Sequence, residues 1–350
     1  MRAPCTRCFI ALALLPATTA ADAADAPEAE LASTPLQLET QVEARKNPLL
    51  AAGLAFLLPG AGQAYLGNWA AAAGYAGATF GQLGLAVAFA LEDQNAPATA
   101  TGTYASPGLS LLMLNQVQTV SLYGIYAAYR DARLYNHNAG YAVAIPDHDL
   151  TTYLLSPFAP EVLRKPEVWL GLIAAVLFVV AYDAGVKAAL TALHFAPQPA
   201  RPLWRQSSVR VLGSDHSRLD GAALSTALNG VLSMQAAMGE EALYRGVLQS
   251  ELRQHLGPWP ALAASSSVFA AMHIANTLLQ PDAETRAGQL LSLPGILLVG
   301  SYMGWIFERN GHSLRESIAF HFWYDVIAMG LGLLINPKST AFTMRIGFAF

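Results

Sequence analysis

The feature of this sequence that most constrains its fold is a series of apolar segments long enough to cross a lipid bilayer. A membrane-spanning helix needs about 20 predominantly apolar residues. Such segments occupy residues 69–91, 109–129, 168–193, 258–279, 288–307 and 314–335. Hydrophobic residues make up 54% of the 350 residues and charged residues only 13%, which is too apolar for an ordinary soluble enzyme. The sequence therefore predicts an all-α, polytopic transmembrane helical bundle of about six to eight membrane helices.

The first 23 residues have the pattern of a signal peptide. Arg2 and Arg7 precede a short apolar core at residues 8–15, and small residues follow Pro16. Because this core is too short to span a bilayer, we expect cleavage rather than an uncleaved anchor. The leader indicates an integral protein of a bacterial inner membrane. The net charge of −4 and the lack of a basic run in the sequence argue against a nucleic acid partner.

The rest of the chain divides into five predicted parts. They are a disordered acidic tether at 24–47, an N-terminal membrane module at 48–135, an interfacial connector at 136–165, a membrane domain at 166–337 and a tail at 338–350. The tether is rich in alanine and interrupted by prolines, which predicts little fold. The module should begin with a half-helix that breaks at Pro59-Gly60, and two spans should follow it.

Two features of the N-terminal module predict helix packing. Glycines recur every three or four positions in the first span, at Gly74, Gly77, Gly81 and Gly84. They share one helical face and predict a close-packing seam for another helix. Polar residues lie inside the second span, at Asn115, Gln116, Gln118 and Thr119. We expect these side chains to bond to neighbouring helices rather than to a ligand.

One later helix, expected over residues 221–255, carries an unusual group of charges. Its centre reads Gly239-Glu240-Glu241-Ala242-Leu243-Tyr244-Arg245. At about 100° per residue, Glu241 and Arg245 share one face and can pair, whereas Glu240 points away. We interpret the pair as structural support, since a Glu and an Arg four residues apart more often form a structural pair than a catalytic unit. An ionisable group at mid-bilayer depth costs about 2.5–3.5 kcal/mol, so Glu240 is a candidate for function.

Two later apolar segments add further ionisable groups. His273 ends the run Phe269-Ala270-Ala271-Met272-His273. His321 and Asp325, four residues apart, share one face of the last span. A lipid-facing position would leave these groups unsatisfied, so we expect them to face a water-accessible cavity together with Glu240.

The order of these residues resembles a known family. Glu-Glu-x-x-x-Arg, then Phe-x-x-x-His, then His-x-x-x-Asn or a close substitute, across successive membrane helices, is similar to the CPBP (Abi) intramembrane endopeptidases. These are relatives of the type II CAAX prenyl protease and of the lysostaphin-resistance-like proteins. The resemblance covers roughly residues 165–335. Asp325 departs from the pattern, because Asn is usual at that position.

The residue types indicate how such a site would hydrolyse a peptide bond. The reaction needs an activated water, a group that takes its proton and donors for the oxyanion. Glu240 is the candidate general base, with His273 helping to hold the water, and the family resemblance implies the same assignment. His321, together with Asp325, is the candidate for oxyanion stabilisation. Because an ionised Asp325 cannot donate a hydrogen bond, it would either orient His321 or stay protonated in the cavity.

Two alternatives concern the chemistry of the site. Glu240, His273 and His321 also have the ligand types of a catalytic zinc site. The chain has no His-Glu-x-x-His motif, and the two histidines lie far apart in the sequence, so we favour a glutamate-activated water without a cofactor. The expected partner is a membrane-embedded or membrane-anchored peptide substrate. The alternative function is a non-catalytic membrane scaffold or small transporter that uses the same polar cavity.

Overall fold

The computed structural model describes residues 45–94, 109–195, 202–212, 214–278 and 283–335. The predicted signal peptide, most of the predicted tether and the predicted tail at 338–350 lie outside the described residues. The described part is mostly helical, as the sequence predicted.

The helices follow the order of the chain. The N-terminal module contains α1 (Pro48–Leu57), α2 (Ala61–Tyr65), α3 (Trp69–Gln94) and α4 (Leu109–Tyr135). The connector contains α5 (Leu150–Leu155), the 3₁₀ helix η2 (Ser156–Phe158) and α6 (Pro160–Leu163). The membrane domain contains α7 (Pro166–Ala192), the 3₁₀ helix η3 (Leu203–Arg205), strands β1 (Ser208–Val211) and β2 (Ser214–Ser217), α8 (Arg218–Glu241), the π-helix η4 (Ala242–Gln249), α9 (Ser250–Leu256), α10 (Pro258–Leu278), α11 (Ala283–Arg309) and α12 (Leu314–Ile335).

The turn between α1 and α2 depends on a glycine. The side chain of Asn47 accepts a hydrogen bond from the backbone N–H of Leu50 and so caps the start of α1. The helix ends before Pro59, and Gly60 has a φ of 89°. A Cβ at Gly60 would lie 2.2 Å from the carbonyl oxygen of Ala72. Both the left-handed backbone and the close approach therefore require glycine at this position.

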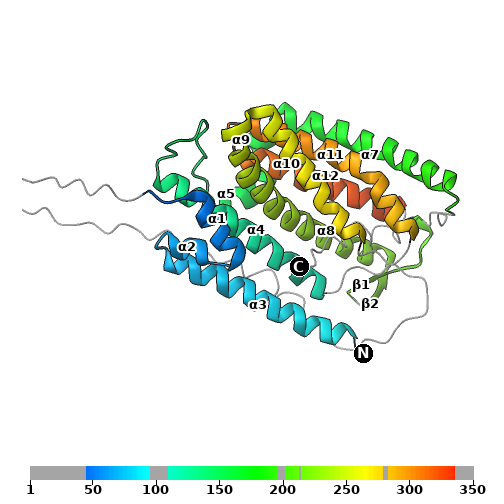
Figure 1. Ribbon diagram of the computed structural model, residues 1–350. Coiled ribbons are helices and arrows are strands. Elements are labelled where there is room, and N and C mark those ends of the chain that lie inside the picture. The colour runs from blue at the N-terminus through cyan, green and yellow to red at the C-terminus, as the bar shows by residue number, and fades with distance from the viewer. Residues whose placement is uncertain (1–44, 95–108, 196–201, 213, 279–282, 336–350) are drawn as a thin grey trace, which may run out of the picture.

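The long helices form a bundle in which α8 is central (Figure 1). α4 packs against α3 on one side and α8 on the other, and α12 packs against α8 and α7. α11 packs between α10 and α7. The short helices α1, α2, α5 and α9 lie at one end of the bundle, and the β1–β2 hairpin lies at the opposite end. This arrangement places α4, α8 and α12 beside one another.

Four of the described helices are long and apolar enough to cross a membrane by length and composition. They are Trp69–Leu91, Pro166–Ala192, Arg286–Arg309 and Leu314–Leu334. All four fall on segments that the sequence predicted as spans. α4 and α10, which were also predicted to span, are not among the four. The apolar helices indicate an integral membrane protein.

The expectation of a wholly helical chain is wrong at one place. β1 and β2 pair as an antiparallel hairpin in which Val209 lies opposite His216. Val209 and Val211 are fully buried and pack in a small cluster with Leu203 and Leu333. The sequence did not reveal the hairpin, because only two alternating apolar positions mark the strand.

Among the described residues, no other helix packs on the predicted glycine seam of α3 at Gly77, Gly81 and Gly84. Gly77, Gly81 and Gly84 are exposed, and a Cβ at any of them would meet no atom within 4 Å. α3 packs against α4 and buries other side chains, at Ala72, Thr79, Gln82 and Ala86. The sequence showed the spacing of the small residues but not which face of the helix meets a neighbour.

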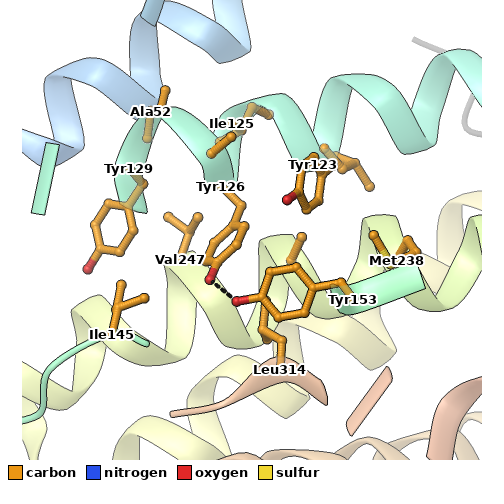
Figure 2. Close-up of a cluster of buried hydrophobic side chains, with 14 of the residues drawn as sticks. Ala52, Tyr123, Ile125, Tyr126, Tyr129, Ile145, Tyr153, Met238, Val247 and Leu314 are labelled. Carbon is orange, nitrogen blue, oxygen red and sulfur yellow. Dashed lines mark hydrogen bonds between the residues drawn. The ribbon is translucent and has the colours of Figure 1, made fainter. Parts of the chain in front are cut away.

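The largest buried cluster joins the N-terminal module to the membrane domain (Figure 2). Among its members are Ala52, Tyr123, Tyr126, Tyr129, Tyr153, Met238, Val247 and Leu314. The hydroxyl oxygens of Tyr126 on α4 and Tyr153 on α5 lie 2.9 Å apart and share a hydrogen bond. Buried tyrosines combine a large apolar area with a satisfied polar group. This cluster fixes α4 against α8 and η4, and so positions one wall of the site.

Candidate functional site

A buried ion pair lies where α8 passes into η4. The side chains of Glu241 and Arg245 are fully buried, and Arg245 Nη1 donates to Glu241 Oε1 over 2.7 Å. Arg245 Nη2 donates to the carbonyl oxygen of Gly300 over 2.7 Å. The guanidinium carbon lies 4.7 Å from the centre of the Phe269 ring. The predicted pairing of Glu241 with Arg245 is therefore present and is held by α10 and α11.

The chain directly after Glu241 is π-helical over eight residues. Such turns are rare and often lie at functional sites. The hydroxyl of Ser250 donates to the carbonyl oxygen of Arg245 over 3.1 Å. A Cβ at Gly246 would lie 2.4 Å from the ring of Tyr126, so the missing side chain lets η4 approach α4 closely. The close approach of η4 anchors the end of α8 against α4.

His321 connects α12 to the ion pair. Its Nδ1 lies 2.9 Å from Glu241 Oε1. A carboxylate paired with Arg245 is ionised and can only accept, so Nδ1 carries hydrogen and donates. The other ring nitrogen, Nε2, lies 3.5 Å from Asp325 Oδ2 and 3.9 Å from Glu240 Oε2. Glu241 therefore orients His321, a contact that the sequence did not reveal.

Glu240 and Asp325 line one cavity between α4, α8 and α12. Its volume is about 50 Å³. Its polar lining consists of Asn115, Gln118, Thr119, Gln235, Glu240 and Asp325. This volume and this lining leave room for water, and the wider hollow around it, which is partly open to the outside, is about 500 Å³. Within the described part of the chain, the Glu240 carboxylate has no hydrogen-bond partner. This agrees with the prediction that Glu240 points away from the Glu241–Arg245 pair.

His273 lies outside this cavity lining. It is half-buried on α10, and its Nδ1 lies 2.9 Å from the carbonyl oxygen of Phe269. Its ring packs against the Phe269 ring with the centres 4.9 Å apart, and the centres of the Phe269 and His321 rings lie 6.3 Å apart. Among the described residues, His273 forms no hydrogen bond or ion pair with Glu240. The structure thus gathers Glu240, Glu241, Arg245, His321 and Asp325, and places His273 against the neighbouring Phe269.

The zinc alternative does not fit this arrangement. In the described ranges, no group of three or more His, Cys, Asp or Glu side chains is placed to hold a metal ion. His273 lies outside the cavity lining that holds Glu240, so the three predicted ligand side chains do not converge on one point.

The polar residues of α4 divide into two groups. Thr119 Oγ1 donates to the carbonyl oxygen of Gln235 over 2.8 Å, and Gln235 Nε2 donates to Gln116 Oε1 over 2.6 Å. These bonds join α4 to α8, as predicted. Asn115 and Gln118 line the cavity, and the side chain of Asn115 donates to the carbonyl oxygen of Leu111 in its own helix. Sequence reasoning missed this second role, whose signal was a run of polar residues inside an apolar helix.

Comparison with known proteins adds one match. Residues 222–327 match the family model described as type II CAAX prenyl endopeptidase Rce1-like. The matched segment holds all six predicted site residues, at Glu240, Glu241, Arg245, His273, His321 and Asp325. The predicted resemblance is confirmed over this segment, which is shorter than expected. No curated protein and no solved structure matches the chain.

Proposed function

We propose, on the premise that residues 222–327 belong to the Rce1-like type II CAAX prenyl endopeptidase family, that this chain is an intramembrane endopeptidase. Its substrate is a membrane-embedded or membrane-anchored protein or peptide. One observation carries the proposal: Glu240, 5% exposed and without a hydrogen-bond partner among the described residues, lines a polar cavity beside His321 and Asp325.

The proposal extends to the membrane arrangement. α4, α8 and α10 join the four apolar helices in the bilayer, which gives the six to eight spans expected from the sequence. Their polar residues then face the interior of the bundle, as intramembrane polar groups require. A bacterial inner membrane is the proposed location.

Glu240 is the proposed general base. It takes a proton from a water molecule in the cavity, and that water attacks the carbonyl carbon of the scissile peptide bond. Glu240 then returns the proton to the amine that leaves. A positioned general base of this kind contributes about 10²–10⁴-fold to a rate.

His321 is the proposed oxyanion donor. Glu241 holds its Nδ1, so Nε2 is fixed on the side of Glu240 and Asp325. When the ring is an imidazolium, with hydrogen on both nitrogens, the hydrogen on Nε2 would point toward the place where the attacked carbonyl becomes an oxyanion. Preorganised donors of this kind stabilise the transition state because they need no rearrangement during the reaction.

Asp325 and His273 have supporting roles in the proposal. Asp325, 3.5 Å from His321 Nε2, orients that nitrogen until a substrate carbonyl takes its place. The family resemblance assigns His273 to holding the water. Its ring packs against Phe269 outside the cavity lining, so that role requires His273 to come closer to the cavity when substrate binds.

A substrate search tests the proposal without assuming which peptide is cleaved. Purified wild-type protein or the Glu240→Gln variant is added to membrane vesicles, and new protein N-termini are identified by mass spectrometry. We expect a set of new N-termini that forms with wild-type protein and not with the variant, although both are folded and inserted. Identical sets, or no new N-termini at all, would reject the peptidase and favour the scaffold or transporter.

A further inference from the structure

The cavity beside Glu240 is closed on one side by α4, which lies outside the matched segment 222–327. We propose that α4 is a substrate-binding wall and that Gln118, with Gln235 on α8, hydrogen-bonds the backbone of an internal, uncharged stretch of the substrate. This inference rests on the proposed peptidase function and specifies how that site recognises its substrate.

Gln118 is available for binding. It is half-buried and lines the cavity, and it has no hydrogen-bond partner among the described residues. Its neighbours differ, because Gln116 and Thr119 bond to Gln235 across the interface between α4 and α8. A glutamine amide presents both a donor and an acceptor, and a peptide bond presents the complementary pair.

Gln235 contributes an unmatched acceptor. Its side chain is 7% exposed, and its Nε2 is used by Gln116. Its Oε1 is buried without a partner among the described residues. A buried acceptor without a donor is unfavourable, and a backbone N–H of a peptide in the cavity would satisfy it. Two amide side chains from facing helices thus offer hydrogen bonds to one bound chain.

The spacing of Gln235 and Glu240 on α8 determines how far from the scissile bond the substrate is held. Gln235 precedes Glu240 by five residues, which corresponds to about 7.5 Å along an α-helix. That distance equals about two residues of an extended peptide. A chain held by Gln235 and Gln118 therefore places a bond about two residues away beside the Glu240 carboxylate.

The acidic charge of the cavity lining determines which part of a substrate polypeptide can bind there. Glu240 and Asp325 are acidic, and none of the described lining residues is Lys, Arg or His. A free carboxylate here would add a third acidic group beside Glu240 and Asp325, which already share the imidazole of His321 at 3.9 and 3.5 Å, and this is unfavourable in a partly buried site. The occupant is therefore an interior stretch of polypeptide and not a free carboxyl terminus.

The test compares two leucine variants on a peptide that the wild-type protein cleaves. Gln118→Leu removes the donor and acceptor at similar side-chain size. We expect KM to rise about tenfold, the value of one lost hydrogen bond, with a smaller change in kcat. Gln82→Leu is the matched control, because Gln82 is a buried amide on neighbouring α3 that is not in the cavity lining. Its KM should equal that of the wild type.

A second arm of the test uses wild-type protein alone, with modified peptides. N-methylation of the peptide bond two residues from the scissile bond removes a backbone N–H, and wild-type protein should cleave this peptide at least several-fold less well. A peptide whose free C-terminal carboxylate lies two residues from the scissile bond should be cleaved less well than the same peptide with an amidated C-terminus. Unchanged kinetics for Gln118→Leu and for the N-methylated peptide would overturn the binding wall while leaving the peptidase intact. Failure of wild-type protein to cleave any peptide would instead overturn the peptidase and the wall with it.

Discussion

Glu241 Oε1 accepts hydrogen bonds from both Arg245 and His321. Bonds between ionised groups are shorter and stronger than neutral ones, and this oxygen joins α8 to η4 and α12. Removing one partner of a buried ion pair leaves the other charge buried without compensation. Glu241 is therefore required for stability as well as for the orientation of His321.

The first prediction concerns this carboxylate. Glu241→Gln keeps the shape of the side chain but leaves Arg245 without its counter-ion. We expect the free energy of unfolding to fall by about 3–5 kcal/mol, the usual cost of breaking a buried pair. The free energy of unfolding is measured by titrating the protein in mixed micelles with a denaturing detergent.

An exposed pair on α7 supplies the control. Lys187 Nζ and Asp183 Oδ2 lie 2.5 Å apart, and their side chains are 55% and 57% exposed. Asp183→Asn breaks this pair in the same way and should cost no more than about 1 kcal/mol. Equal losses for Asp183→Asn and Glu241→Gln would contradict the importance of burial.

The second prediction concerns the residue that departs from the family pattern. Asp325→Asn places the usual Asn in the cavity at nearly the same size, and the Asn amide can donate to an oxyanion. We expect this variant to retain peptidase activity, whereas Asp325→Leu should lose about tenfold or more, since it removes the polar group beside His321. The initial rates of the two variants and of the wild type are measured on the same peptide. An Asn variant as inactive as the Leu variant would show that the carboxylate itself is needed.

Part of the site could be predicted residue by residue. The Glu241–Arg245 pair and the divergence of Glu240 follow from helical geometry within one helix. The contact of His321 with Glu241 does not, because it depends on how α12 packs on α8. The position of His273 outside the cavity lining likewise depends on how α10 packs in the bundle, which no spacing rule within one helix specifies.

At the scale of elements, α11 approaches α10 closely at Gly300, where a larger side chain would disturb the packing. Its carbonyl accepts from Arg245, and a Cβ there would lie 2.8 Å from Phe269 Cδ1. The third prediction is that Gly300→Ala lowers the free energy of unfolding by about 1–3 kcal/mol, as overpacking of an interior does. The same detergent titration measures the loss.

Gly81→Ala on α3 is the matched control for Gly300→Ala. A Cβ at Gly81 would meet no atom within 4 Å. Because alanine favours a helix by about 1 kcal/mol over glycine, this variant should be as stable as the wild type or slightly more so. A destabilised Gly81→Ala protein would show that the glycine face of α3 is packed after all.

Helices could be predicted where a long apolar segment indicates them. The four helices that can span a membrane were expected from hydropathy alone. The β1–β2 hairpin was missed because two buried valines are too short a pattern. The π-helix η4 was missed because a bulge arises from packing of the finished bundle, here where Gly246 meets Tyr126.

At the scale of the whole molecule, three exposed tryptophans mark one edge of the apolar bundle. Trp69, Trp169 and Trp259 lie near the starts of α3, α7 and α10, and their exposed fractions are 72%, 45% and 66%. These helix starts lie at the end of the bundle that also carries α1 and α9 (Figure 1). Tryptophan favours the boundary between lipid tails and headgroups.

The fourth prediction is that these three side chains lie at one membrane interface. In variants that keep one of them, fluorescence should be quenched more strongly by lipids brominated near the headgroup than by lipids brominated near the tail end. A variant that keeps only Trp323, which is partly buried and donates to the carbonyl oxygen of Pro157, should be quenched weakly by both. Strongest quenching of any of the three by the deep lipid would contradict this placement.

The central claim is that Glu240 activates water in the cavity between α4, α8 and α12. Its most direct test is the rate at which reconstituted Glu240→Gln protein hydrolyses a membrane-anchored peptide that the wild type cleaves, with Glu284→Gln on α11 as control. We predict a loss of about 100-fold or more for Glu240→Gln at unchanged thermal stability, and little change for the control. Hydrolysis by Glu240→Gln at nearly the wild-type rate would contradict the account.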